Sequence, residues 1–370
     1  MDYFCYTRLS SKFECKQGES EVQTNDNPCG LDGFAFLEFS GPDKNKLHQQ
    51  FIDMGFEAVA THQDEDITLF KQGDIQFIVN AATHCQAAAH AVTHGAGACA
   101  MGFKVQDAKA AFQYAIEHGA TAFKDTAHTH HGLPAIEAIG GSVIYFVDDT
   151  HQPFAQKWNI INSAPVQGNG LMYIDHLTHN VYRGNMDKWA AFYESLFNFQ
   201  EIRFFNIKGK MTGLISRALG SPCGKIKIPL NESKDDMSQI EEFLHDYKGE
   251  GIQHIALTTN NIYNTVHSLR TQGVKFLDVP DTYYEMLDER LPWHEEPVAQ
   301  LNAEKILMDG EVDPKFGLLL QIFTENIFGP VFFEIIQRKG NQGFGEGNFQ
   351  ALFEAIERDQ VKRGTLKEYS

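Results

Sequence analysis

The chain has 370 residues, of which 42% are apolar and 22% charged, and this composition excludes wholesale disorder and a collagen or coiled-coil architecture. Its 49 acidic and 31 basic side chains give a formal net charge of −18, which argues against binding to nucleic acid or to an anionic membrane surface. No run approaches the roughly 18 apolar residues of a membrane-spanning helix, and the N-terminus has no pattern of a secretory signal. The six cysteines are scattered without a CxxC pair, so we expect free thiols and a soluble, cytoplasmic protein.

The first part of the chain predicts a polar arm and then two units of strands and helices. Residues 1–29 lack hydrophobic periodicity, which predicts a mobile N-terminal arm. The first unit is predicted to contain the strand Phe34–Phe39, the helix Lys44–Met54, and the strands Thr68–Phe70 and Ile75–Val79. The second is predicted to contain the strand Cys99–Val105, the helix Ala108–His118 with Gly119 after its end, and the strand Ser142–Val147.

The same order returns after a polar stretch rich in proline and glycine, residues 156–170, which we expect to be a linker. The elements predicted beyond it are the strand Met172–Leu177, the helix Met186–Leu196, the strand Gln253–Thr258, the helix Ile262–Thr271, and a pair of strands, Leu318–Thr324 and Val331–Ile336.

This recurrence indicates an internal duplication. The segment Gly97–Gly119 aligns with Gly251–Gly273, and each encloses a strand followed by a helix. We therefore predict an α+β protein of four βαβββ modules, paired into two domains that each curl into a half-open barrel. The expected domains are residues 30–155 and residues 171–362.

The two halves differ in the side chains that their strands carry. The second half has His176, His254 and Glu334, each within a strand-like run. The first half has Ala100 opposite His254 and Tyr145 near the position of Glu334, so we expect it to be non-catalytic. Two imidazoles and one carboxylate leave about three open positions on an octahedral ion, and they suit Fe(II), Mn or Zn. A single histidine in an apolar strand is usually a core residue, but three candidate ligands at related strand positions favour a metal site.

The remaining histidines are expected to have structural or surface roles. His179 lies three residues from His176, an offset that points the two side chains to opposite faces of a strand. We interpret the region of His128, His130 and His131 as a solvated loop. The others fall in an alanine-rich polar stretch (His84, His90 and His94) or on predicted helices (His245 and His267).

The glycine-rich segment Gly340–Gly347 matches no phosphate-binding spacing, and Glu346 would repel an anion, so we interpret it as a hinge. Asn348 is predicted to cap a closing helix, residues 348–360, with Phe349, Leu352, Phe353 and Ile356 on one apolar face. Two roles stay open for this helix: simple packing on the barrel, or a lid over an apolar pocket.

Several of these segments resemble the 4-hydroxyphenylpyruvate dioxygenases. The resemblance rests on Phe332–Arg338, Gly343–Phe353, Ile174–Val181 and Gly251–Ala256, and on shorter matches at Leu320–Thr324, Tyr283–Tyr284 and Arg290–Pro292. It extends from about residue 30 to residue 360 and is most specific in the second half. That family has the vicinal-oxygen-chelate fold, which is the paired βαβββ architecture predicted above.

The resemblance implies an Fe(II) ion held by His176, His254 and Glu334. It implies that the chain converts 4-hydroxyphenylpyruvate and O2 to homogentisate and CO2, a step of tyrosine and phenylalanine breakdown. The substrate contacts that it implies are Ser216, Pro229, Asn231, Gln239, Gln253, Gln321, Phe323, Phe344 and Phe349. Neutral polar groups suit the phenol of this substrate, and aromatic rings suit its ring.

Three alternatives remain open from the sequence. Hydroxymandelate synthase uses the same iron and substrate but oxidises the benzylic carbon. An extradiol ring-cleaving dioxygenase has the same fold, and a non-catalytic module could bind an aromatic ligand. The resemblance also implies a homodimer or homotetramer.

Overall fold

We describe the protein from a computed structural model, which places residues 26–124, 132–153, 157–208, 213–236 and 238–348. Residues 1–25 of the predicted N-terminal arm, the His128–His131 region, and Phe349 with the rest of the closing helix expected at residues 348–360 lie outside these residues. Within them, no helix has both the length and the apolarity needed to cross a bilayer.

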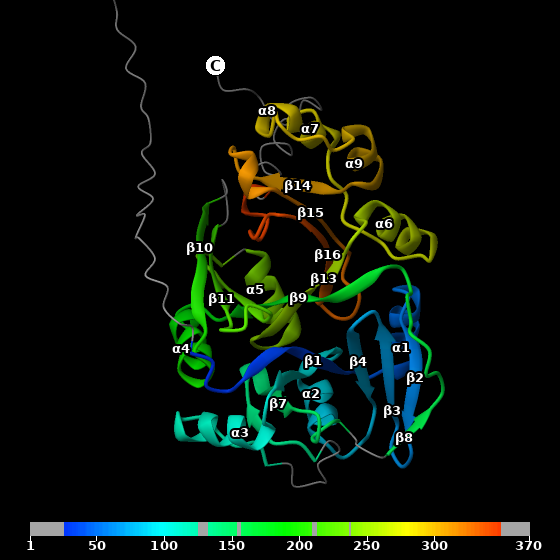
Figure 1. The fold of residues 1–370 in the computed structure, drawn as a ribbon, viewed down its shortest axis with the longest axis vertical. Coiled ribbons are helices and arrows are strands. Elements are labelled where there is room, and N and C mark those ends of the chain that lie inside the picture. The colour runs from blue at the N-terminus through cyan, green and yellow to red at the C-terminus, as the bar shows by residue number, and fades with distance from the viewer. Residues whose placement is uncertain (1–25, 125–131, 154–156, 209–212, 237, 349–370) are drawn as a thin grey trace, which may run out of the picture.

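The first half forms an eight-stranded sheet in the order β6-β7-β5-β1-β4-β3-β2-β8 (Figure 1). Its strands are β1 (Leu31–Ser40), β2 (Glu57–His62), β3 (Ile67–Gln72), β4 (Ile75–Asn80), β5 (Gly97–Val105), β6 (Ala135–Glu137), β7 (Val143–Val147) and β8 (Trp158–Ile160). Its helices are α1 (Lys44–Asp53), α2 (Gln86–His94) and α3 (Ala108–Glu117), with a short 3₁₀ turn, η1, at Ile139–Gly141.

The second half forms another eight-stranded sheet, in the order β10-β11-β12-β9-β13-β16-β15-β14, stacked on the first along the long axis of the molecule (Figure 1). Its strands are β9 (Leu171–Val181), β10 (Gln200–Lys208), β11 (Gly213–Gly220), β12 (Lys227–Ser233), β13 (Gly251–Thr259), β14 (Leu307–Gly310), β15 (Leu318–Phe323) and β16 (Phe332–Lys339). Its helices are α4 (Met186–Phe197), α5 (Gln239–Tyr247), α6 (Ile262–Thr271), α7 (Asp281–Tyr284), α8 (Leu287–Arg290) and α9 (Val298–Glu304), with a 3₁₀ turn, η2, at Pro314–Phe316.

The predicted fold class is confirmed, because both sheets are built from βαβ units and curl into half-open barrels (Figure 1). The predicted duplication is visible in the element bounds: β5 and β13 begin at Gly97 and Gly251, and α3 and α6 follow at matching positions. One module is shorter than expected, since only β6 and β7 follow α3 in the described residues.

Two local expectations differ from the structure. The segment that we expected to be a linker contains β8, which pairs with β2 at the edge of the first sheet. The helix that we expected to begin at Asn348 begins two residues earlier, at Glu346. The Asn348 side chain therefore caps no helix; its Oδ1 instead accepts a hydrogen bond from the Tyr283 hydroxyl (2.6 Å).

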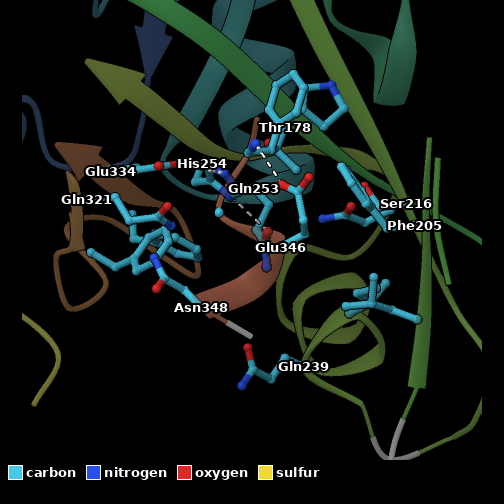
Figure 2. Close-up of a pocket in the computed structure, with 18 of the residues that line it drawn as sticks. Thr178, Phe205, Ser216, Gln239, Gln253, His254, Gln321, Glu334, Glu346 and Asn348 are labelled. Atoms are coloured by element: carbon cyan, nitrogen blue, oxygen red, sulfur yellow. Dashed lines mark hydrogen bonds and ion pairs between the residues drawn. The ribbon is translucent and has the colours of Figure 1, made fainter. Parts of the chain in front are cut away.

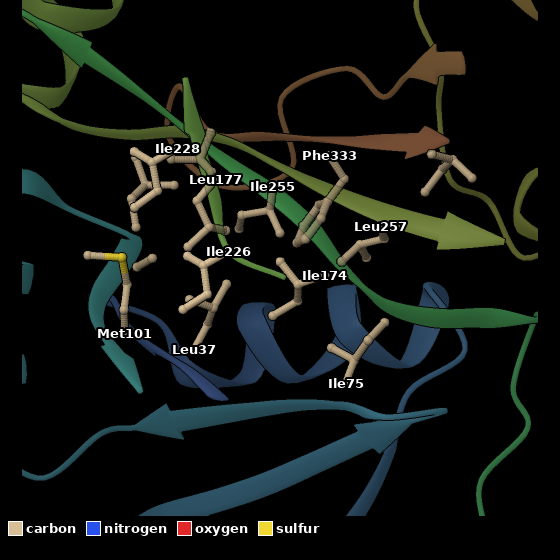
Figure 3. Close-up of a cluster of buried hydrophobic side chains, with 14 of the residues drawn as sticks. Leu37, Ile75, Met101, Ile174, Leu177, Ile226, Ile228, Ile255, Leu257 and Phe333 are labelled. Atoms are coloured by element: carbon tan, nitrogen blue, oxygen red, sulfur yellow. The ribbon is translucent and has the colours of Figure 1, made fainter. Parts of the chain in front are cut away.

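The two halves share one hydrophobic core. Figure 3 shows its centre, where Leu37, Ile75 and Met101 of the first half face Ile174, Leu177, Ile226, Ile228, Ile255, Leu257 and Phe333 of the second. Phe328, in the turn between β15 and β16, contacts the rings of Phe39 and Phe51 at centroid distances of 5.4 and 6.1 Å. The first half thus supports the turn that leads into β16, the strand of Glu334.

Candidate active site

The structure brings His176, His254 and Glu334 together on three adjacent strands, β9, β13 and β16. One potential ligand atom from each lies within 4.8 Å of the others. The Oε2 atom of Glu334 is 3.2 Å from His176 Nε2 and 3.6 Å from His254 Nε2. The strand register explains this convergence, because Ala256 on β13 pairs with His176 on one side and with Glu334 on the other.

The other nitrogen of His176 is held by its neighbour in the sequence. His176 Nδ1 lies 2.8 Å from Asp175 Oδ1, and both side chains are buried. Adjacent strand residues normally face opposite ways, but the β9–β13 register shifts here, so that Asp175 is the extra residue of a β-bulge. Since a carboxylate accepts the Nδ1–H, the ring presents the lone pair of Nε2 to the site.

His254 has the same arrangement on β13. Gln253 is the extra residue at a second register shift, and its Oε1 lies 3.1 Å from His254 Nδ1. The Nε2 lone pair of His254 therefore also faces Glu334. Two bulges, one beside each histidine, orient both rings toward the same Glu334 oxygen.

The surroundings shift the pKa values of the two histidines in opposite directions. Burial holds the pKa of His254 well below its usual range, with a further lowering from nearby His176, so this ring is neutral. Burial also opposes the charged form of His176, but the carboxylates of Glu334 and Asp175 outweigh it and raise the pKa of His176. A bound metal ion requires the neutral form of both rings, with both Nε2 lone pairs free.

The residues present fit a divalent metal ion. Glu334 is 2% exposed, yet its Oε1 has no hydrogen-bond partner among the described residues. A buried carboxylate oxygen without a partner is costly, so this atom calls for a ligand that the protein itself does not provide. Two imidazole nitrogens and one carboxylate on one side of a cavity are the donor set of an open octahedral site.

The first half retains the backbone of the site without its chemistry. The pairing of β1 with β5 has register shifts at the matching positions. Gly102 on β5 pairs with Phe36 on β1 and with Tyr145 on β7. Phe36, Ala100 and Tyr145 thus occupy the positions of His176, His254 and Glu334. The Phe36 and Tyr145 rings lie 6.0 Å apart within a buried apolar cluster, so side chains fill the space that is a pocket in the second half.

A cavity of about 250 Å³ adjoins the three candidate ligands (Figure 2). Of the nine side chains expected at the substrate, eight line it: Ser216, Pro229, Asn231, Gln239, Gln253, Gln321, Phe323 and Phe344. Phe349, the ninth, lies outside the described residues.

The cavity has two chemically different ends. Phe344 and Phe323 have their ring centroids 5.3 Å from His176 and 6.3 Å from His254, respectively, and form aromatic walls beside the candidate ligands. Ser216 and Asn231 are cross-strand partners on β11 and β12. Gln239, at the start of α5, lies at the opposite end of the cavity from Glu334 (Figure 2).

The sequence reasoning missed several residues of the site. Thr178, Phe205, Glu346 and Asn348 also line the cavity, and Glu346 had been considered only as part of a hinge. Thr178 lies two residues from His176 on β9, and this alternation could have identified it. Phe205 and Glu346 reach the cavity only through the pairing of β10 and the path of the chain after β16.

Among the described residues, the other histidines do not line the cavity. His179 is fully buried on β9 and its Nε2 lies 2.8 Å from the Tyr193 hydroxyl, as its strand offset suggested. His90 and His94 are buried on α2, where the His94 ring stacks on Tyr247 of the second half. The His245 side chain is exposed, as expected.

Comparison with known proteins places this site in a family. Residues 25–157 match the profile of "Hydroxyphenylpyruvate dioxygenase, HPPD, N-terminal", and residues 173–287 match the "Glyoxalase/Bleomycin resistance protein/Dioxygenase superfamily". The chain is 83% identical to the 4-hydroxyphenylpyruvate dioxygenase of Legionella pneumophila (strain Corby), over 93% of this chain and 99% of that protein. The chain belongs to the 4-hydroxyphenylpyruvate dioxygenase family.

Solved structures of the 4-hydroxyphenylpyruvate dioxygenase family and its neighbours share the fold. A fusion of a xylose isomerase-like TIM barrel with 4-hydroxyphenylpyruvate dioxygenase aligns with a TM-score of 0.76 and 30% identity, over 90% of this chain and about half (53%) of that one. A triple mutant of 4-hydroxymandelate synthase from Streptomyces coelicolor also aligns with a TM-score of 0.76, at 26% identity, over 89% of this chain and 99% of that one.

Proposed function

We propose that this chain is an Fe(II)-dependent 4-hydroxyphenylpyruvate dioxygenase, with His176, His254 and Glu334 as the metal ligands. The observation that carries the proposal is the convergence of two Nε2 atoms on a buried carboxylate at the wall of an aromatic cavity. The 83% identity to a 4-hydroxyphenylpyruvate dioxygenase over nearly the whole chain supports the substrate and the product.

The proposed reaction balances without a further co-substrate. 4-Hydroxyphenylpyruvate loses its carboxylate as CO2, and the two atoms of O2 enter the new carboxylate and the new ring hydroxyl of homogentisate. When bound, Fe(II) supplies the redox chemistry that the side chains of this site lack, and its open positions suit a 2-oxo acid.

The side chains of the chain itself position the substrate. With the 2-oxo acid group near Glu334, the phenol points toward the distant polar end, where Ser216 and Asn231 are cross-strand partners. Asn231 also pairs with Asn180 on β9, four positions from His176, or about 13 Å of strand. A hydroxyl and an amide there can hydrogen-bond a neutral phenol without ionising it.

The aromatic walls hold the substrate ring and exclude water. Phe344 and Phe323 lie beside the two histidines, and Phe332 stacks on His254 with a centroid distance of 4.9 Å. Aromatic contacts contribute ~0.5–1.5 kcal/mol each beyond area burial. A dry, apolar wall also protects reactive species from side reactions with solvent. We propose that Gln239, Gln253, Gln321, Pro229 and Phe349 complete this enclosure.

The polar lining includes one side chain that is poised to accept a hydrogen bond. Gln321 is 1% exposed, and its Oε1 has no hydrogen-bond partner among the described residues. A donor group on the substrate would satisfy this oxygen. Gln253 has less freedom, because its Oε1 is already the partner of His254.

Oxygen uptake tests the proposal. The purified chain with Fe(II), ascorbate and 4-hydroxyphenylpyruvate should consume O2 and release homogentisate and CO2 in equal amounts. His176→Ala, His254→Ala and Glu334→Ala should each abolish uptake, whereas His245→Ala, which removes an exposed histidine, should not. Normal turnover by any of the three would refute the ligand assignment.

Product identity separates the closest alternative. A hydroxymandelate synthase would consume the same substrate and O2 but release 4-hydroxymandelate, and chromatography of the reaction mixture distinguishes the two acids. The structural match to a hydroxymandelate synthase is at 26% identity, far below the match to the dioxygenase. Release of 4-hydroxymandelate would overturn the proposed product. A homodimer or homotetramer remains a prediction, and gel filtration tests it.

A further inference from the structure

The guanidinium of Arg338 joins two parts of the site that are distant in sequence. Arg338 lies on β16, four residues after Glu334. Its Nε and Nη2 donate to Oδ2 and Oδ1 of Asp175 at 2.8 and 2.7 Å, which is a bidentate pair. Its Nη1 donates to the backbone carbonyls of Asn341 and Gly343, at 3.1 and 2.7 Å. One side chain therefore fixes β9 and the loop after β16 at the same time.

The Asp175 end of this pair reaches the candidate metal site. The same Oδ1 that accepts from Arg338 lies 2.8 Å from His176 Nδ1. Asp175 is 3% exposed, and the only other cation near it in the described residues is Lys227, whose Nζ is 3.5 Å from Oδ2. With Arg338 occupying both oxygens, the carboxylate has a fixed orientation, and so does the hydrogen bond that orients His176.

The loop end of the pair reaches the cavity. Gly343 precedes Phe344, whose ring lines the cavity and lies edge-on to His176. The guanidinium carbon of Arg338 is 5.8 Å from the centroid of that ring. The position of Phe344 thus depends on the same guanidinium that orients Asp175.

The non-catalytic half provides an internal comparison. Its β1 has a bulge at the matching place, but the bulge residue is Ala35 where the second half has Asp175. The backbone irregularity therefore exists without a carboxylate, and the fold does not need one there. The carboxylate occurs in the half that has the histidines, which associates it with the site rather than with the sheet.

We propose that Asp175 and Arg338 are a positioning pair that holds the His176 ring for the metal and, through the same guanidinium, holds Phe344 against the substrate. The proposal rests on the proposed function, because it assigns this pair a role toward the ion and substrate named there. Neither residue lines the cavity. A buried ion pair contributes little net stability compared with apolar side chains of similar size, so geometry is the better reason for its presence.

Metal binding measured without turnover tests the Asp175 arm. Under anaerobic conditions, Fe(II) binding by equilibrium dialysis should be 10- to 100-fold weaker in Asp175→Asn and in Arg338→Gln than in the unmodified chain. The matched control is Arg217→Gln, since Arg217, on β11 of the same sheet, is also paired with carboxylates, Glu194 of α4 and Glu201 of β10, but away from the metal site. It should bind Fe(II) within twofold of the unmodified chain.

Steady-state kinetics at saturating Fe(II) test the loop arm. Arg338→Gln should raise KM for 4-hydroxyphenylpyruvate at least tenfold, because Phe344 is no longer held. Arg338→Lys keeps a cation beside Asp175, so it should recover most of the Fe(II) affinity. It should not restore KM, because an ammonium group cannot reproduce the planar fork that reaches both Asp175 and the loop.

The outcomes are distinguishable. Failure of the unmodified chain to bind Fe(II) would overturn the proposed function and this inference with it. Fe(II) binding and turnover by the unmodified chain, together with unchanged Fe(II) affinity in Asp175→Asn, would overturn the inference alone. Circular dichroism checks the fold of each variant. If Asp175→Asn does not fold, Arg338→Lys decides, because a KM equal to that of the unmodified chain would refute the coupling.

Discussion

A substitution of Phe328 tests whether the first half stabilises the half that carries the candidate site. Its side chain is 2% exposed, and it extends from the β15–β16 turn of the second half into an aromatic cluster of the first. Its ring packs edge-on against Phe39 at 5.4 Å and against Phe333 at 5.9 Å. Truncation of a buried phenylalanine costs about 3–5 kcal/mol through lost transfer free energy and the cavity left behind. Because aromatic partners surround this ring on several sides, we expect Phe328→Ala to lose about 4 kcal/mol.

Urea unfolding of the metal-free chain measures this loss. Tryptophan fluorescence reports on both halves, since Trp158 lies in the first and Trp189 in the second. The control is Phe316→Ala, at a phenylalanine that is 42% exposed, which should change stability by less than about 0.5 kcal/mol. A loss below about 1 kcal/mol for Phe328→Ala would refute the reasoning, because the turn would then not depend on the first half.

Three further outcomes follow from particular contacts. Gly345 has φ +79°, and an added Cβ would lie 1.9 Å from Gln321 Oε1. Gly345→Ala should therefore displace the Gln321 side chain and raise KM for 4-hydroxyphenylpyruvate. An unchanged KM would contradict the cavity geometry. Burial lowers the pKa of His90 to about 3 in the folded chain, against about 6.5 in the unfolded chain. Below about pH 6.5 the unfolded state therefore binds a proton that the folded state does not, and the free energy of unfolding falls as the pH drops. This amounts to about 1 kcal/mol between pH 7 and pH 5.5, and His90→Gln should show a correspondingly smaller loss in urea titrations at the two pH values. Removing the metal with a chelator should lower the melting temperature of the unmodified chain, because a ligand at 100 times its Kd stabilises the folded state by about 2.7 kcal/mol. In Glu334→Gln the chelator should leave the melting temperature unchanged.

Much of the site could be predicted from the sequence because its information is local. His176, His254 and Glu334 each lie in a short apolar run, and such runs predict strands without any knowledge of their neighbours. The duplication relates the halves, and the matching bounds of α3 and α6 show how regular it is. The resemblance to the dioxygenases added the residues that line the cavity.

Other features depend on contacts between distant segments. The sequence alone did not reveal α2 or β8, because an alanine-rich stretch and a polar stretch acquire their structure from the sheet that they pack on or pair with. The last described helical turn begins at Glu346, two residues earlier than the sequence indicated. The Asn348 side chain accepts a hydrogen bond from the Tyr283 hydroxyl and does not cap a helix.

The sequence by itself determined which side chains are available to bind a metal ion and on which strands they lie. Only the tertiary structure decided how those side chains are aimed. A bulge is an irregularity in the pairing of two strands, so no single strand can specify it. The bulges at Asp175 and Gln253 let neighbouring side chains reach the two histidines, and the burial of Phe36 and Tyr145 closes the corresponding space in the first half. Both depend on hydrogen bonds and packing between residues far apart in the chain, which spacing along the sequence does not encode.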